Sequence, residues 1–268
     1  MPHPLGIESL TVLGMGPVEH VTLAADLGCS AVSMGLTPPA FNPHGYASWS
    51  LRDDAGLRHK LKAVLRERGI VMALAEGLSV SAEKDASELA ADMDLFAELG
   101  ALRVSAVDRG VERGRVYDQL AALAGMTRER GMEFSFSFCP AFTICNLEEA
   151  LKVVRHIGEG DATVLIDSMH FFRSGGTVRQ IAELDPALIG YVQLCDGPRK
   201  SGGESMQEVM YSRMIPGEGE LPLREFVDAL PRGQMLGLEV PLMAEAESGR
   251  PAPDYIREIV AKTRDLLA

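Results

Sequence analysis

The residues best suited to chemistry stand at the ends of three apolar runs in the second half of the chain. Asp167 ends one run and His170 follows three residues later, while Gln193 and Glu239 lie near the ends of two later runs. Oxygen ligands from Asp, Gln and Glu suit a hard divalent cation, with Mn²⁺ or Mg²⁺ the best match. A carboxylate at a strand end can also simply cap the next helix, but three such side chains on consecutive runs favour a shared metal site.

A cation at such a site would support proton transfer next to a carbonyl group. The ion can hold both oxygens of an α-hydroxy ketone and acidify the carbon between them. A nearby carboxylate then removes the proton. Return of the proton to another carbon, or to the other face of the same carbon, gives isomerisation or epimerisation.

Short apolar runs alternate with amphipathic stretches along the chain, and this alternation predicts the fold. Strands are expected at Leu5–Leu10, Ala31–Met34, Val71–Ala75, Leu102–Val107, Glu133–Phe138, Thr163–Asp167, Ile189–Leu194 and Met235–Val240. Helices are expected at Val18–Leu27, Ala55–Arg68, Ala82–Leu99, Arg115–Arg130, Leu147–Ile157, Val178–Leu184, Leu223–Leu230 and Pro253–Leu267. Such units pair in parallel through right-handed crossovers, and about 250 residues suffice to close a barrel. We therefore predict an α/β protein with a single (β/α)8 TIM barrel domain over residues 1–268.

Charge and hydropathy restrict the partners. The formal net charge is −12, whereas nucleic-acid binding needs clustered Lys and Arg to neutralise phosphates. No 18-residue apolar stretch occurs, and no basic segment leads into an apolar run at the N-terminus. We expect a cytoplasmic protein that acts on a small molecule, without nucleic acid or membrane.

Two connections are longer than the short loops that usually join strands to helices. They are Thr37–Ser50, which holds the single tryptophan, and Gly197–Leu221, which holds Met206, Met210 and Tyr211. Both follow predicted strands, so both are expected at the catalytic face as lids or pocket walls.

Several motifs resemble those of the xylose-isomerase-like TIM barrel superfamily. They are the Asp-x-x-His pair at Asp167, the seventh strand with Asp196 beyond it, the segment Arg213–Gly219 and the final Leu238–Val240. The superfamily contains sugar-phosphate isomerases and epimerases, ketose 3-epimerases, hydroxypyruvate isomerase, inosose dehydratase and dehydroshikimate dehydratase. The resemblance spans nearly the whole chain, is concentrated after residue 130, and does not select one reaction.

The resemblance implies a set of metal ligands and one departure from it. Asp167 and Glu239 match two metal-binding acids of the family, and Gln193 stands where many members have His. Members usually end the fifth strand with Glu, but this chain has Ser137 there. A divalent ion is therefore expected at Asp167, Gln193 and Glu239 and near Ser137, bound more weakly than at a complete site.

The resemblance also implies roles in the reaction. Glu239 is expected to be the principal base, and His170 and Arg213 to contact the oxygen of the substrate. Arg173, close behind His170, is a further candidate substrate contact. Because a two-base epimerase needs a second carboxylate, Glu76 at the end of the third strand is a candidate, although it could equally be a surface acid before a helix.

Aromatic residues beyond the strand ends predict an apolar rim. Phe142 and Phe172 are candidate substrate contacts, since both lie past the ends of predicted strands. Such a rim suits a cyclic or aromatic keto compound better than a phosphosugar. It would equally suit a homodimer interface.

Three functions remain open at this point. The leading one is a metal-assisted isomerase or epimerase acting on a sugar-like or cyclic hydroxy-keto substrate. A lyase or dehydratase needs only one base and one acid, here Glu239 and His170. A degenerate barrel that binds a ligand without turnover is the third.

Overall fold

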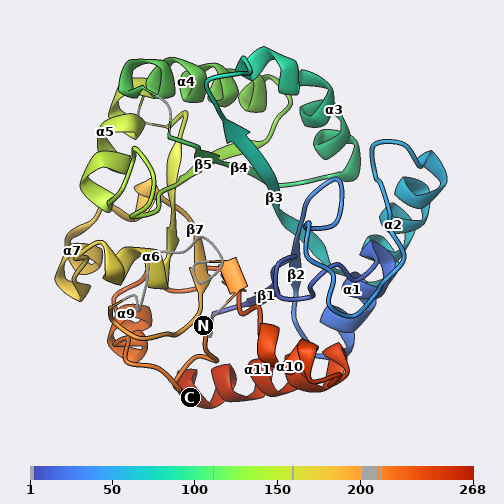
Figure 1. Cartoon of the computed structure of the whole chain (residues 1–268). Helices are drawn as coiled ribbons and strands as arrows, with labels where there is room; N and C mark the ends of the chain where they lie inside the picture. Colours follow the sequence, from blue (N-terminus) through green and yellow to red (C-terminus); the bar gives the residue numbers. More distant parts are fainter. Residues whose placement is uncertain (1–2, 111, 159, 201–209, 212) are drawn as a thin grey trace.

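The computed structural model is a closed barrel of parallel strands surrounded by helices (Figure 1). It describes residues 3–110, 112–158, 160–200, 210–211 and 213–268. The strands follow one another around the barrel in chain order, and the last pairs in parallel with the first. The predicted (β/α)8 TIM barrel is confirmed.

The strands are β1 (Leu5–Ile7), β2 (Ala31–Met34), β3 (Val71–Val80), β4 (Arg103–Asp108), β5 (Glu133–Ser137), β6 (Thr163–Asp167), β7 (Ile189–Leu194) and β8 (Leu236–Leu238). The α-helices are α1 (Pro17–Asp26), α2 (Ala55–Arg68), α3 (Ala90–Leu99), α4 (Arg113–Glu129), α5 (Leu147–Ile157), α6 (Ser168–Arg173), α7 (Val178–Glu183), α9 (Leu223–Asp228), α10 (Met243–Glu247) and α11 (Ala252–Leu267). Two 3-10 turns, η1 (Ala86–Leu89) and η2 (Pro186–Leu188), precede α3 and β7.

Most predicted elements are present, and the differences have local causes. β2, β6, β7, α2 and α5 begin and end as predicted. The helix expected from Ala82 starts only with η1, where Asp85 and Glu88 form a capping box that satisfies free backbone N–H groups. β3 continues to Val80 because it keeps pairing with β4 across a shift in register after Ala75. Helices α6 and α10 were not predicted.

The interior of the barrel is narrow and partly polar. Ala31, Ala73, Leu74, Leu165 and Tyr191 form a small apolar cluster that is separate from the large core between strands and helices. The Tyr191 ring is fully buried, so its hydroxyl needs a partner inside the barrel. That partner belongs to the site described below.

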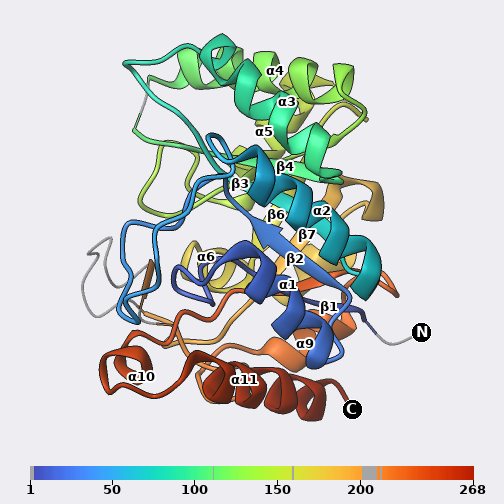
Figure 2. The ribbon, with the colours of Figure 1, turned by 90° about the vertical axis from the view of Figure 1, so that its right-hand side faces the viewer.

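The two long connections meet. The rings of Phe41 and Tyr211 lie 5.5 Å apart, so the segment after β2 contacts the segment after β7. Figure 2 shows the connection after β2 extending from the barrel on the side away from the two chain ends. Met206 lies outside the described residues. No helix in the described part of the chain is long and apolar enough to cross a membrane.

Candidate active site

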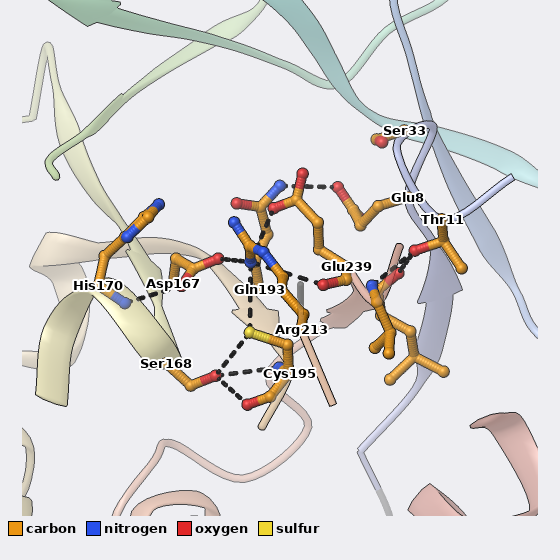
Figure 3. Close-up of polar contacts among 12 residues, drawn as sticks. Glu8, Thr11, Ser33, Asp167, Ser168, His170, Gln193, Cys195, Arg213 and Glu239 are labelled. Carbon is orange, nitrogen blue, oxygen red and sulfur yellow. Dashed lines mark hydrogen bonds and ion pairs between the residues drawn. The ribbon is translucent and has the colours of Figure 1, made fainter. Parts of the chain in front are cut away.

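Three predicted residues come together where β6, β7 and β8 end. Asp167 pairs in register with Gln193, and Glu239 directly follows β8. The three residues are 2%, 5% and 7% exposed. Figure 3 shows their polar groups directed toward one another. Parallel strands deliver all three because their carboxyl ends share one rim.

Arg213 lies at the centre of this group. Its guanidinium forms an ion pair with Asp167, lies 3.6 Å from Glu239 Oε2, and donates to Cys195 Sγ at 3.2 Å (Figure 3). The Arg213 side chain is 3% exposed. A buried guanidinium needs such partners, because an unpaired charge in the interior is costly.

The loop that carries Arg213 is tied to the barrel by Asp196. Backbone hydrogen bonds of 2.9 Å run both ways between Asp196 and Met214. The Asp196 carboxylate also accepts backbone N–H groups from Gly197 at 2.8 Å, Gly217 at 2.9 Å and Leu221 at 3.1 Å. Asp196 was noted in the sequence only as part of a motif, and its role here is to fold the loop.

Burial and the Arg213 guanidinium determine the protonation of Asp167 and Glu239. Burial raises the pKa of Glu239 well above its ordinary value, and Arg213 offsets this only in part. Burial also raises the pKa of Asp167, but the attraction of Arg213 outweighs it and leaves that pKa below its ordinary value. Asp167 is therefore ionised, whereas Glu239 holds its proton to a higher pH than an exposed glutamate does.

His170 lies next to Asp167, in the first turn of α6. Its backbone N–H donates to Asp167 Oδ1 at 3.0 Å, so Asp167 caps α6 as well as pairing with Arg213. Burial lowers the pKa of His170 to about 4, although Asp167 acts in the other direction. Its imidazole is therefore neutral at neutral pH, so one ring nitrogen can donate a hydrogen bond and the other can accept one.

A fourth acid, Glu8, was missed by the sequence interpretation. Glu8 is fully buried and accepts hydrogen bonds from the Tyr191 hydroxyl at 2.7 Å and from Gln193 Nε2 at 3.0 Å. Burial, and secondly repulsion from Glu76, raise its pKa to about 8. A side chain at Gly237 would collide with the Glu8 carboxyl, so glycine leaves the space that Glu8 fills.

Glu76 is neither a surface acid nor the start of a helix. It lies within β3, half-buried, and its Oε1 accepts hydrogen bonds of 2.5 Å from Ser9 Oγ and Ser33 Oγ. The repulsion between Glu76 and Glu8 places both acids in one electrostatic group with Glu239.

The remaining predicted substrate contacts lie in three different parts of the structure. Arg173 donates from Nε to the Pro198 carbonyl at 3.2 Å and so contacts the loop after β7. Phe142 is half-buried just before Thr143, whose backbone N–H donates to buried Asp108. Phe172 packs edge-on against Phe226 of α9, with ring centroids 5.6 Å apart. The ring of Phe172 thus contributes to packing among the helices, and its expected contact with substrate stays a prediction.

Comparison with known proteins places the chain in a family. A family model described as the xylose isomerase-like TIM barrel matches residues 21–266. The chain belongs to this family. A search of curated proteins finds no match.

Solved structures of several family-like barrels resemble this one. An IolI protein with a bound zinc atom has a TM-score of 0.76 at 17% identity, over 98% of this chain and 99% of that one. An L-ribulose 3-epimerase has a TM-score of 0.73 at 15% identity, over 99% of this chain and 94% of that one. The probable 3-DHS dehydratase AsbF of Bacillus anthracis has a TM-score of 0.75 at 11% identity, over 96% of this chain and 97% of that one. At these identities the likeness shows the shared fold alone.

Family membership implies a divalent cation, but the residues at the mouth of this xylose isomerase-like barrel differ from a metal site. Within the described chain, no group of three or more His, Cys, Asp and Glu side chains could hold a metal ion. The two predicted acidic ligands, Asp167 and Glu239, are bridged by the guanidinium of Arg213. Gln193 is tied through its amide N–H to Glu8, and Ser137 at the end of β5 brings no charge. This arrangement does not fit a resident divalent ion.

Proposed function

We propose that this protein is an isomerase or epimerase that moves a proton next to the carbonyl group of a sugar-like or cyclic hydroxy-keto substrate. The observation that carries the proposal is the charged Arg213 guanidinium held beside the buried carboxyls of Asp167 and Glu239, with Glu8 and Glu76 electrostatically coupled to them. A buried cation beside a carboxyl with a raised pKa, here Glu239, is suited to removing a proton while stabilising the charge that develops.

In this proposal Glu239 is the base. Its ionised form takes the proton from the carbon next to the carbonyl, and the electron pair of that C–H bond moves toward the carbonyl oxygen. The raised pKa of Glu239 makes it a stronger base than an exposed carboxylate, at the cost of a smaller ionised fraction at neutral pH. Arg213 stabilises the negative oxygen, and neutral His170 donates a hydrogen bond to it.

Glu8 supplies the second proton-transfer group for which the sequence had suggested Glu76. Its pKa of about 8 keeps it protonated at neutral pH, so it can return a proton to the substrate. Glu76 then acts through Glu8, because its negative charge helps to keep the Glu8 proton in place.

The Mn²⁺ or Mg²⁺ expected from the sequence is not used in these steps. Its place between Asp167 and Glu239 is taken by Arg213, which carries the positive charge that the reaction needs. The setting is proposed to be cytoplasmic, with a small-molecule substrate and no nucleic acid or membrane. Phe142 and the Phe41–Tyr211 pair are proposed as apolar contacts for the substrate, and a homodimer remains a prediction.

Solvent deuterium uptake tests the proposal. Wild-type protein is incubated in D₂O with a panel of sugar-like and cyclic hydroxy-keto compounds, and deuterium at the carbon next to the carbonyl is followed by NMR. Glu239→Gln should lose exchange by about 10²–10⁴-fold, the usual effect of removing a general base. Binding of the substrate should remain. Exchange at the wild-type rate in Glu239→Gln would overturn the assignment, and loss in Glu76→Gln alone would move the base to β3.

The same experiment separates the alternatives. A dehydratase or other lyase would release water or another group and give an unsaturated product, with Glu239 as base and His170 as acid. The lyase was favoured because only one carboxylate, Glu239, was expected at the site, and a lyase needs only one base. The buried carboxyl of Glu8 supports the epimerase instead, because it offers a second proton-transfer group. A compound that binds without exchange or elimination would indicate a barrel that only binds its ligand.

A further inference from the structure

We infer that the guanidinium of Arg213 is the resident cation of this barrel mouth and that a divalent ion can enter between Asp167 and Glu239 only by displacing it. The inference concerns the site of the proposed reaction but does not need that reaction to be correct. Its readouts are metal binding and stability, which require no substrate.

The contacts of Arg213 support this assignment. Its Nη1 atom is ion-paired with Asp167 and lies 3.6 Å from Glu239 Oε2 and 3.5 Å from the Glu239 carbonyl oxygen. The side chains of Arg213, Asp167 and Glu239 are 3%, 2% and 10% exposed. A positive group that is this well buried and directed at both acids competes with any second cation for the same oxygens.

The charge balance of the site agrees with the contacts. A divalent ion that joined Arg213 beside Asp167 and Glu239 would face strong repulsion, since like charges a few ångströms apart in the interior are weakly screened. The other predicted ligands, Gln193 and Ser137, are neutral and cannot compensate. A metal ion would therefore bind only if Arg213 left its partners.

The loop that carries Arg213 is built to hold it there. The two backbone hydrogen bonds between Asp196 and Met214 fix the residue directly after Arg213. Asp196 is itself 1% exposed, and its carboxylate holds the loop by accepting the backbone N–H groups of Gly197, Gly217 and Leu221. Displacing Arg213 thus requires its side chain to turn away from a backbone that is already anchored.

Mn²⁺ binding, followed by the paramagnetic resonance signal of the free ion, and thermal unfolding test the inference. Wild type and the surface control Arg179→Gln, which breaks an exposed pair with Glu183, should bind Mn²⁺ weakly and keep their melting temperature when it is added. Arg213→Gln should melt lower without the ion, because Asp167 and Glu239 lose their partner. It should bind Mn²⁺ about tenfold more tightly or better and regain melting temperature when Mn²⁺ is present.

Two results would overturn the inference. One is a wild-type protein that binds one Mn²⁺ per chain as tightly as Arg213→Gln does. The other is tight binding of one Mn²⁺ by Ser137→Glu, a variant that adds a third acid and keeps Arg213. We expect this variant to bind Mn²⁺ weakly, and tight binding would show that Arg213 does not exclude the metal. The Ser137→Glu result tests the inference even if Arg213→Gln does not fold. Loss of deuterium exchange alone bears on the proposed reaction and not on this inference.

Discussion

At the level of single residues, the acids of the site were only partly visible in the sequence. Asp167 and Glu239 stood out because each ends an apolar run, and the structure brings them together around Arg213. Glu8 was hidden because the predicted first strand ran from Leu5 to Leu10, although the strand ends at Ile7. An acid directly after an apolar run at a barrel mouth was the signal that could have found Glu8.

The raised pKa of Glu8 makes a prediction about stability. The pKa of Glu8 is about 8 in the folded protein against 4.5 for the free side chain. Between these values the folded state holds a proton that the unfolded state has released, so this group lowers stability as pH rises from about 4.5 to about 8. Below pH 4.5 Glu8 is protonated in both states, and the loss disappears.

Replacing Glu8 by Gln should remove this loss. At pH 8 we expect Glu8→Gln to unfold at a higher urea concentration than wild type, with a free energy of unfolding greater by about 1–3 kcal/mol. Near pH 4.5 the free energies of unfolding of the two proteins should be close to each other. Glu76→Gln is the matched comparison, because it keeps Glu8 but removes the repulsion that helps to raise its pKa. It should reduce the pH dependence without abolishing it. Parallel pH profiles for Glu8→Gln and wild type would show that Glu8 is not held protonated.

At the level of elements, apolar periodicity located the strands and helices well and their ends less well. β6 and β7 have the predicted bounds. β8 was predicted from Met235 to Val240 but pairs only from Leu236 to Leu238. Periodicity reports which residues are apolar, and it does not report where neighbouring backbones stop pairing.

β8 also carries a prediction of its own at Gly237. A Cβ at this position would overlap the Glu8 carboxyl and come within 2.7 Å of the Tyr191 hydroxyl. We expect Gly237→Ala to lower the free energy of unfolding, measured with urea, by about 1–3 kcal/mol, because the tightly packed barrel interior cannot move to accommodate the added methyl group. Gly125→Ala in α4 is the control. Nothing lies within 4 Å of its added Cβ, and it should be neutral or stabilising by about 0.5–1 kcal/mol. Equal effects of the two changes would contradict the close packing of Glu8 against β8.

At the level of the whole molecule, the topology followed from the alternation of strands and helices, but the position of Arg213 did not. Arg213 and Asp167 are 46 residues apart, and Arg213 lies in a connection rather than a strand. Strand ends meet at one rim by geometry alone. A loop residue meets them only if the loop folds in one way, and here Asp196 determines that folding through its hydrogen bonds to the Gly197, Gly217 and Leu221 backbone.

Removal of the Asp196 carboxylate should therefore affect both the loop and the distant acids. We expect Asp196→Ala to lower the free energy of unfolding by about 1–3 kcal/mol, because buried backbone N–H groups lose their acceptor. Asp228→Ala, which removes only an exposed pair with Arg224, should stay within about 0.5 kcal/mol of wild type. Because Arg213 is positioned by the same loop, Asp196→Ala should also bind Mn²⁺ more tightly than wild type, while Asp228→Ala should not. A destabilised Asp196→Ala protein with unchanged Mn²⁺ binding would show that Arg213 is held by Asp167 and Glu239 alone, and that the loop follows the ion pair instead of determining it.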